Sequence, residues 1–398
     1  MIYSKFKILI TILFLFCFFN INAQEGTGIF LNTINHSIES KILNEKKSYI
    51  VSLPPSYNNV KSDYPVMLIL DGKYHVHYAS TTIEVMSKEG QIPEMIIVAV
   101  NTDEHRTRDL SPTKSVIGYN GEDNSEWLND SGGGLQFLSF LEDEVLPEVK
   151  KNYRAKDYFM FVGHSLGGLM AAESYLNNGE FKSYIAIDPS FWWDNDYIIN
   201  KIDTTTIKKV GSKKFYFSGA NSYDKTNGMI ANMRESHELF IATLKNAGVS
   251  YKNVNFDVFE EEDHGSVPLI SLYYGLLFIF QDYVLEDAAS KTIEEVEQHY
   301  INLSNSLGIS FLPPENVINM VAWAKFNGNL RDEAYKFFEL NIKNYPTSNT
   351  AYEMLGYAYN NAGNSKKALD NFKKSLKFNT NKNEVKRIKE LIASLEKQ

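Results

Sequence analysis

The spacing of apolar residues divides the chain into two parts. From about residue 25 to residue 285, short apolar runs alternate with helical patterns. The runs that predict strands are Tyr49–Leu53, Tyr64–Leu70, Met95–Val100, Tyr158–Val162, Tyr184–Ile187, Lys214–Ser218 and Val254–Phe259. Helical patterns lie between them, for example at Gly134–Lys151, Leu166–Asn177 and Met229–Ala247. Because the middle runs are continuously apolar, they predict a parallel sheet covered on both faces, and the alternation predicts an α/β fold.

After about residue 285 the strand signals disappear and helical periodicity takes over. A repeat of 34 residues, the period of tetratricopeptide repeats, is visible near the C-terminus. The recurring pairs are Ala334 with Ala368 and Phe338 with Phe372. We expect repeats at 316–348 and 349–382, followed by a capping helix over 384–397. Packing against the first domain and docking of a protein or peptide partner are both open roles for these helices.

The N-terminus has the pattern of a secretory signal. Lys5 and Lys7 precede an apolar run, Ile8–Phe19, and the small Ala23 follows a few residues later. The run is shorter than the roughly 20 apolar residues that span a membrane. We therefore expect cleavage after Ala23, export to the periplasm or the medium, and no membrane span in the mature chain. An uncleaved N-terminal anchor is the alternative.

These patterns predict four segments, and composition limits their partners. The segments are a signal peptide (1–23), an α/β domain (24–285), a helical linker (286–315) and tetratricopeptide-like helices (316–398). Acidic residues outnumber basic ones, 49 to 40, so the chain lacks the basic excess that is typical of nucleic-acid binding. Cys17 is the one cysteine, which excludes an internal disulfide and a multi-cysteine metal site. We expect no nucleic-acid partner, no metal and no cofactor.

The strongest chemical signal follows the predicted strand that ends at Val162. Gly163-His164-Ser165-Leu166-Gly167 fits the Gly-x-Ser-x-Gly turn between a strand and a helix, called the nucleophile elbow. Such a turn presents the serine hydroxyl above the carboxyl end of the sheet. Ser165 is therefore the predicted nucleophile. The N–H of Leu166, at the start of the helix, is the first predicted donor to an oxyanion.

A serine hydroxyl is a weak nucleophile and needs a base, which follows the serine in the chain order of this fold. Three histidines come after Ser165. His237 lies inside a predicted helix and His299 lies in the helical linker. His264 directly follows the last predicted strand, so His264 is the predicted general base.

The acid that orients this histidine should lie in the loop after the preceding strand. That loop is Gly219–Asp224, and Asp224 is the predicted acid. Glu235 and Asp257 are weaker alternatives. A Ser-His dyad without an acid also remains open.

Further loops at the same edge of the sheet supply candidate donors and pocket walls. The strand Tyr64–Leu70 ends at Asp71-Gly72-Lys73, so the N–H of Lys73 or Gly72 is the predicted second oxyanion donor. Trp192 and Trp193 follow another strand and are predicted to line an acyl or aryl pocket, with core packing as the alternative.

Two arginines lie in the loop after the strand Met95–Val100. Arg106 and Arg108 are candidates for binding an anionic or catechol substrate. The alternative is that they form ion pairs with Asp103 or Asp109 and so hold the loop.

Taken in order, these motifs resemble the "Putative esterase" family of α/β hydrolases, which includes siderophore esterases, S-formylglutathione hydrolase, and feruloyl and acetylxylan esterases. The motifs are Tyr64-Pro65 to Leu70-Asp71-Gly72, Arg106-x-Arg108-Asp109-Leu110-x-Pro112, Gly163–Gly168, Pro189-Ser190-x-Trp192-Trp193 and Asp263–Ser266. The resemblance covers about residues 35–285 and is strongest to the siderophore-esterase branch. It implies a metal-free serine hydrolase with Ser165 as nucleophile and His264 as base.

The chain departs from this family at two positions. Asp188 stands where siderophore-type members often have a serine, and Ser222 stands where the family usually has its acid. The identity of the acid is therefore open.

We expect an exported serine esterase that hydrolyses a small-molecule or glycan-linked ester, with a siderophore-type ester as the first candidate. A feruloyl or acetylxylan ester of a plant polysaccharide is the alternative substrate. A non-catalytic hydrolase fold that docks partners through its helices is the alternative function.

Overall fold

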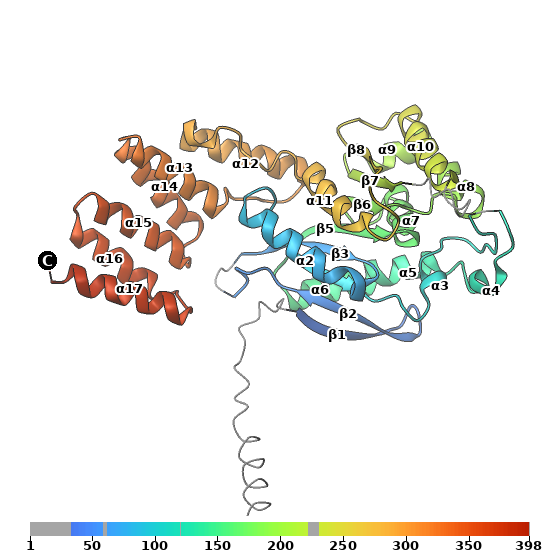
Figure 1. Cartoon of the computed structure of the whole chain (residues 1–398), viewed down its shortest axis with the longest axis horizontal. Helices are drawn as coiled ribbons and strands as arrows, with labels where there is room; N and C mark the ends of the chain where they lie inside the picture. Colours follow the sequence, from blue (N-terminus) through green and yellow to red (C-terminus); the bar gives the residue numbers. More distant parts are fainter. Residues whose placement is uncertain (1–32, 59–61, 120, 222–230, 398) are drawn as a thin grey trace, which may run out of the picture. The chain divides into compact units, whose positions relative to one another are not determined.

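The central sheet has eight strands, one more than the seven apolar runs that predict strands (Figure 1). The computed structural model describes residues 33–58, 62–119, 121–221 and 231–397, which lie in one compact unit of the chain. The strands are β1 (Thr33–Ser40), β2 (Glu45–Ser52), β3 (Tyr64–Ile69), β4 (Ile96–Val100), β5 (Ala155–His164), β6 (Ser183–Ile187), β7 (Lys214–Ala220) and β8 (Val254–Phe259). Their order is β1-β2-β4-β3-β5-β6-β7-β8. β1 and β2 form an antiparallel hairpin, and β2 joins β4 in antiparallel fashion.

From β4 to β8 all neighbouring strands are parallel. The carboxyl ends of these strands therefore meet at one edge of the sheet, where sites lie in open α/β folds. The nucleophile elbow and the loops after β3, β4, β6 and β8 all begin at this edge.

Helices cover both faces of the sheet because its side chains alternate between two cores. Met67 and Ile69 face the core that includes α2 and α11, whereas Val66 and Leu68 face the core that includes α5, α6, α7 and α10. The elements of this part are α2 (Gly72–Lys88), α3 (Arg106–Asp109), α4 (Ser125–Leu128), α5 (Gly134–Phe140), η1 (Leu141–Val145), α6 (Leu146–Asn152), α7 (Leu166–Leu176), α8 (Trp193–Asn200), α9 (Thr204–Val210), α10 (Ala231–Asn246) and α11 (Val267–Ile279).

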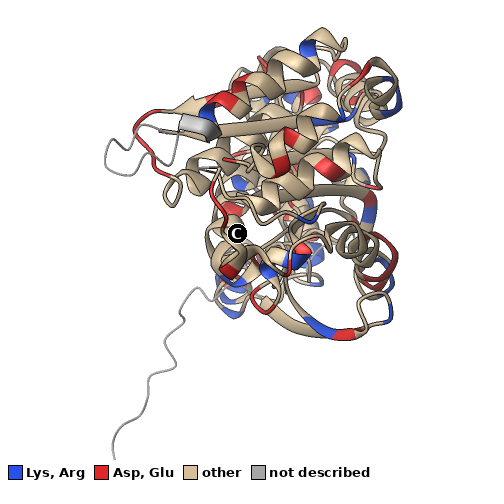
Figure 2. Cartoon of the chain, turned by 90° about the vertical axis from the view of Figure 1, so that its right-hand side faces the viewer, with Lys and Arg blue, Asp and Glu red and all other residues tan. Residues whose placement is uncertain are grey.

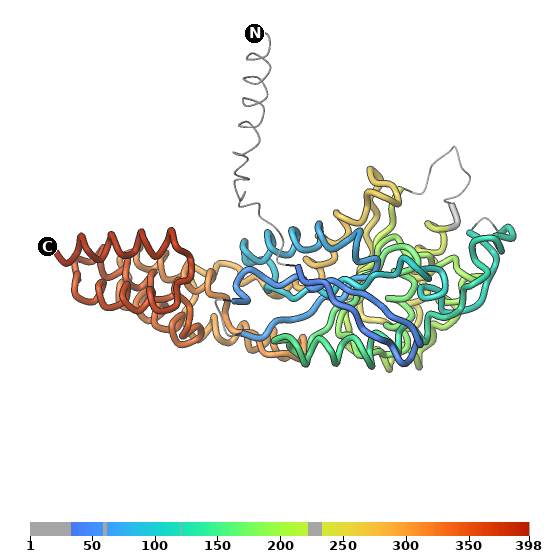
Figure 3. Tube along the Cα trace, turned by 90° about the horizontal axis from the view of Figure 1, so that it is seen from below, coloured from blue at the N-terminus to red at the C-terminus, as the bar shows by residue number. Residues whose placement is uncertain are grey.

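The rest of the chain is helical. It comprises η2 (Ala288–Ser290), α12 (Ile293–Leu307), α13 (Glu315–Asn327), α14 (Arg331–Asn344), α15 (Asn349–Asn361), α16 (Ser365–Ser375) and α17 (Lys382–Leu395). The hairpin α13–α14 is followed by the hairpin α15–α16, and Figure 3 shows these successive turns. Ala334 and Phe338 of the first hairpin and their counterparts in the second are buried. The tetratricopeptide class of these helices and the predicted domain boundaries stay predictions.

Two features of the fold were not predicted. The first is β1, which pairs with β2 along eight residues of mostly exposed side chains. The second is the π-helical turn η1, which interrupts the helix expected over 134–151.

The predicted signal peptide lies outside the described residues. Within the described part, no helix combines the length and apolarity needed to cross a membrane. Figure 2 shows basic and acidic residues mixed along the elements in that view.

Candidate active site

Ser165 occupies a strained turn between β5 and α7, as predicted for a nucleophile elbow. Its backbone has φ 60° and ψ −120°, a region that a side chain with a Cβ rarely adopts. Hydrogen bonds to the neighbouring strand hold this conformation: the N–H of Ser165 donates to the carbonyl of Ile187 at 2.9 Å, and its carbonyl accepts from the N–H of Ser190 at 3.1 Å. A Cβ on Gly163 would lie 2.1 Å from the carbonyl oxygen of Gly167, so this close approach requires a glycine at 163.

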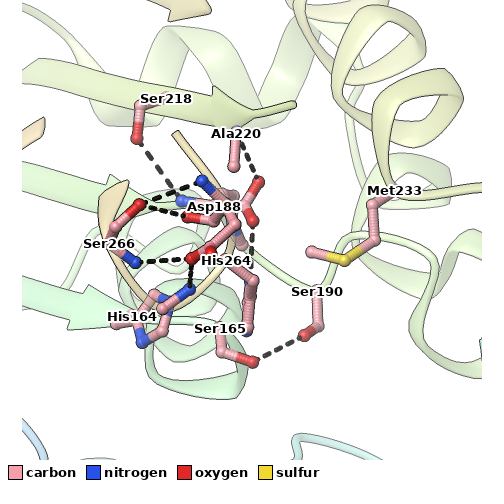
Figure 4. Close-up of polar contacts among 12 residues, drawn as sticks. His164, Ser165, Asp188, Ser190, Ser218, Ala220, Met233, His264 and Ser266 are labelled. Carbon is pink, nitrogen blue, oxygen red and sulfur yellow. Dashed lines mark hydrogen bonds and ion pairs between the residues drawn. The ribbon is translucent and has the colours of Figure 1, made fainter. Parts of the chain in front are cut away.

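His264 lies in the loop after β8, beside the elbow (Figure 4). Its Nδ1 is 2.6 Å from Oδ2 of Asp188, the residue that follows β6. An N–H at Nδ1 that donates to this carboxylate leaves Nε2 as the atom able to accept a proton. Sequence reasoning placed His264 correctly after β8, but it did not identify its partner.

Asp188 is buried and well supported as an anion. Its Oδ1 accepts a hydrogen bond from the N–H of Ala220 at 3.0 Å. Burial opposes the charge, but the hydrogen bond from His264 and the imidazole of His237 outweigh it and hold the pKa of this carboxyl below its ordinary value. The group is therefore ionised at neutral pH and can stabilise an imidazolium at His264.

This contact points to a different carboxylate from the predicted acid. Asp224 lies outside the described residues, and Nδ1 of His264 is already paired with Asp188. The prediction looked for the acid after β7, whereas the carboxylate that contacts His264 follows β6, one strand earlier. The sequence marks Asp188 only as a departure from the family pattern, at the position before Pro189-Ser190, and not as a partner of His264.

The Ser165 hydroxyl points toward Ser190 (Figure 4), with the two Oγ atoms 3.4 Å apart. No hydrogen bond joins Oγ of Ser165 to His264 among the described contacts. Catalytic hydrogen bonds are often loose in unliganded enzymes and tighten with substrate.

Two helix starts supply the predicted oxyanion donors. Leu166 begins α7, and Gly72 and Lys73 begin α2, at the same edge of the sheet. The first N–H groups of a helix have no partner within it, so these groups are available to a ligand oxygen. A Cβ on Gly72 would lie 2.5 Å from the carbonyl oxygen of Ala99, so only glycine fits there. The side chain of Lys73 instead forms an ion pair with Asp103.

Arg106 links the two helix starts. Its Nε and Nη2 donate to the carboxylate of Asp71 at 2.8 and 2.9 Å, and Nη2 also lies 3.4 Å from the carbonyl oxygen of His164. Burial opposes the charge of Asp71, but Arg106 and the hydroxyl of Thr102 outweigh it and lower the pKa of this carboxyl. Arg106 thus holds a loop, as in the alternative given above, but through Asp71 and not through Asp103 or Asp109. Its substrate-binding role stays a prediction.

Arg108 is held in a partly buried ion-pair cluster. Its guanidinium donates to Asp109 at 2.8 Å and is paired with Glu45. Lys47 joins the cluster through Asp109 at 2.7 Å. The structure therefore favours the loop-holding alternative for Arg108 over substrate binding.

The two tryptophans after β6 have different environments. Trp193 is fully buried, and its Nε1 donates to Oγ1 of Thr113 at 3.1 Å. This burial favours the core-packing alternative for Trp193, because its ring is part of the apolar core. Trp192 is partly exposed and packs edge-on against Tyr119, with ring centroids 5.7 Å apart. Its role as a pocket wall stays a prediction.

His237, which the sequence placed inside a helix, lies on α10 behind the acid. It is fully buried, and its Nε2 is 2.7 Å from the carbonyl oxygen of Pro189. Its Nδ1 lies 3.9 Å from Oδ1 of Asp188. His237 therefore supports the turn that carries the acid but does not reach Ser165.

A cavity of about 590 Å³ lies near the amino ends of the parallel strands. Its lining includes Tyr64 at the start of β3, Lys156 at the start of β5, and Glu94 and Glu315. Neither Ser165 nor His264 lines it, so we assign no ester chemistry to this cavity.

The fold and this site define an α/β hydrolase. The sequence model of the family described as "Putative esterase" matches residues 40–229 of the chain. The family is one of ester hydrolases, so the expected resemblance is confirmed.

Individual relatives share this part of the chain. The ferri-bacillibactin esterase BesA of Bacillus subtilis is 29% identical over 252 residues, which cover 59% of this chain and 86% of that protein. An IroE-like serine hydrolase from Shewanella oneidensis is 25% identical, with a TM-score of 0.69 over 78% of this chain and 98% of that chain. An uncharacterised protein from Capnocytophaga ochracea is 16% identical, with a TM-score of 0.57 over 92% of this chain and 100% of that chain. The last similarity shows that the shared fold extends into the helices after α11.

Proposed function

We propose that the chain is a serine esterase in which Ser165, His264 and Asp188 form the catalytic triad. The observation that carries this proposal is the 2.6 Å contact between His264 and a buried aspartate, beside a serine on a strained elbow. The alternative function, docking of a partner without catalysis, does not require an ionised carboxylate paired with a loop histidine.

The reaction follows from the geometry. Nε2 of His264 takes the proton of Ser165 while Oγ attacks the ester carbonyl, and Asp188 stabilises the imidazolium that results. The N–H groups of Leu166 and of Lys73 or Gly72 bind the oxyanion, and losing one such donor raises the barrier by about 2.7–4 kcal/mol. The imidazolium then protonates the leaving alcohol. A water, activated by the same histidine, hydrolyses the acyl-enzyme.

We further propose a siderophore-type ester as substrate and export of the chain. The similarity to the ferri-bacillibactin esterase supports the first, and the apolar run that follows Lys5 and Lys7 supports the second. A protein or peptide partner for the hairpins α13–α14 and α15–α16 stays a prediction.

Hydrolysis by the purified chain tests this function. Release of p-nitrophenol from short acyl esters measures the chemistry, and cleavage of a catecholate trilactone measures the substrate class. Replacing Ser165 by Ala should lower kcat by roughly 10³–10⁶. Ser190→Ala is the matched control, because its hydroxyl is a neighbour of the nucleophile, and it should keep most of the activity. Equal activity of wild type and Ser165→Ala would contradict the proposal.

A further inference from the structure

His164 lies against the face of the proposed general base. The rings of His164 and His264 have centroids 4.4 Å apart and planes inclined by 37° (Figure 4). His164 is the last residue of β5, directly before the nucleophile, and His264 comes from the loop after β8. The fold thus places the imidazole of His164 against that of His264, next to Ser165.

Among the described contacts, the ring of His264 is held by one hydrogen bond and by the ring of His164. The side chain of His264 is 46% exposed, and Asp188 fixes only one atom, Nδ1. A single hydrogen bond at Nδ1 sets the position of that atom but leaves the ring free to tilt about it. The direction in which Nε2 points, and hence its approach to Ser165, depends on what meets the face of the ring. That surface is the ring of His164.

His164 is itself fixed in place. Its ring meets His75 edge-on, with centroids 5.8 Å apart and an interplanar angle of 85°. Nη2 of Arg106 lies 3.4 Å from its carbonyl oxygen. Nε2 of His164 is buried without a hydrogen-bond partner among the described residues. Burial, with the nearby imidazoles of His264 and His75, lowers the pKa of His164 to about 3, so the ring is neutral at neutral pH.

We propose that His164 is a positioning residue for His264: its neutral ring fixes the plane of the general base and offers an aromatic face to the imidazolium. The proposal rests on the proposed function, since it takes His264 as the base. The proton moves from Oγ of Ser165 to Nε2 of His264, and His164 neither gains nor loses one. A cation over an aromatic face is stabilised by the charge distribution of the ring.

The charged and titratable groups that face His264 come from several elements. They are Asp188 after β6, Asp263 from its own loop, His237 from α10 and His164 from β5. Because His164 is neutral, replacing it by Phe or Leu leaves the local charge unchanged. Phe keeps an aromatic face, whereas Leu fills similar space without one. Comparing the two variants therefore separates the effect of an aromatic ring beside His264 from the effect of filling the same space.

The test compares His164→Phe and His164→Leu with wild type in steady-state hydrolysis over pH 5–9 on full-length purified protein. We expect His164→Leu to lower kcat by about two- to fivefold with little change in KM, and to move the acid limb of kcat/KM to lower pH, because the imidazolium loses the stabilisation that the aromatic face gives it. His164→Phe should stay close to wild type. Equal losses in both variants, or an unmoved acid limb in His164→Leu, would overturn the proposal.

A second measurement keeps this test separate from the proposed function. The chemical shifts of the His264 ring, followed by NMR against pH in a Ser165→Ala background, need no turnover. We expect the midpoint of this titration to move to lower pH in His164→Leu and not in His164→Phe. If wild type hydrolyses no ester, the proposed function fails, while this titration still decides whether His164 acts on His264. Thermal unfolding of each variant confirms that it is folded.

Discussion

Three residues of the site have backbones with positive φ although none is a glycine. The φ angles are 60° for Ser165, 39° for Asp188 and 52° for Asp71. Such conformations cost about 1–3 kcal/mol each and persist where the surroundings hold them. Hydrogen bonds do so here: Ser165 is bound to Ile187 and Ser190, and Asp71 to Arg106. At the scale of single residues, strained backbone thus occurs at the nucleophile elbow, at the aspartate that contacts His264 and at the start of α2.

The first prediction concerns the acid. Replacing Asp188 by Asn keeps the shape of the side chain but removes the charge that stabilises the imidazolium. We expect kcat for p-nitrophenyl ester hydrolysis to fall by about 10²–10⁴. Asp224→Asn is the matched control and should remain close to wild type. If Asp224→Asn lost activity and Asp188→Asn did not, the acid would be Asp224 in the loop after β7.

The second prediction concerns stability in acid. The pKa values of Asp71 and Asp188 are lowered in the folded protein. A lowered carboxyl pKa stabilises the fold above the unfolded value of about 3.9, and this stability is lost as pH falls through the folded value. Arg106→Met removes the main partner of Asp71. The free energy of unfolding, measured with urea between pH 3 and pH 7, should be much lower for the variant than for wild type at pH 7. This difference in free energy should become smaller below about pH 4. A difference that does not change with pH would exclude this linkage.

At this scale the sequence indicates some site residues and not others. Ser165 and His264 are predictable because the elbow motif and the last strand are local patterns. Asp188 is not, because the choice between the loops after β6 and β7 depends on which carboxylate reaches His264 across the sheet. Arg106 shows the same limit, since its partner Asp71 is 35 positions away in sequence.

At the scale of elements, the elbow depends on how closely β5 and α7 approach each other. The two elbow glycines differ in this respect. A Cβ at Gly163 would meet the backbone of Gly167 at 2.1 Å, whereas a Cβ at Gly167 would meet the side chain of Leu70 at an ordinary 3.5 Å.

The third prediction uses this difference. Gly163→Ala should lower the free energy of unfolding by at least about 1–3 kcal/mol, because the backbone it meets cannot move aside. Gly167→Ala should change stability by no more than about 1 kcal/mol, since alanine favours a helix over glycine. Denaturant unfolding of both variants checks this. Similar stability losses in the two variants would contradict the geometry of the turn.

The strands of the sheet are largely predictable because buried parallel strands are continuous apolar runs. The exception is β1, Thr33–Ser40, whose polar, exposed side chains carry no such signal. Its pairing with β2 is a backbone interaction, which composition does not indicate. The turn η1 was missed for a similar reason, because Leu141–Val145 continues the helical spacing of its neighbours.

At the scale of the whole molecule, the described helices after α11 share a core with the sheet. One apolar cluster includes Met160 of β5, Leu272 of α11, Tyr300 of α12 and Phe338 of α14. Tyr300 also donates a hydrogen bond to the carbonyl of Tyr283 at 3.2 Å. The helical periodicity predicts these helices, but it does not predict this common core.

The fourth prediction follows from the shared core. We expect calorimetry of the purified chain to show one heat-unfolding transition with equal calorimetric and van't Hoff enthalpies. Phe311, 7% exposed, packs edge-on against Tyr283 with ring centroids 5.8 Å apart. Phe311→Ala should lower the Tm of this one transition, since burial of such a ring contributes about 3–5 kcal/mol. Two separate transitions in wild type would show that the helices and the sheet unfold independently.

The central claim is that Ser165 is a nucleophile activated by His264 and Asp188. Labelling with a fluorophosphonate, followed by mass spectrometry of the intact chain and its peptides, tests this most directly. We predict one adduct per chain, located on Ser165, absent in Ser165→Ala, and formed far more slowly in His264→Ala and Asp188→Asn. An adduct on another residue, or labelling that persists in Ser165→Ala, would contradict the account.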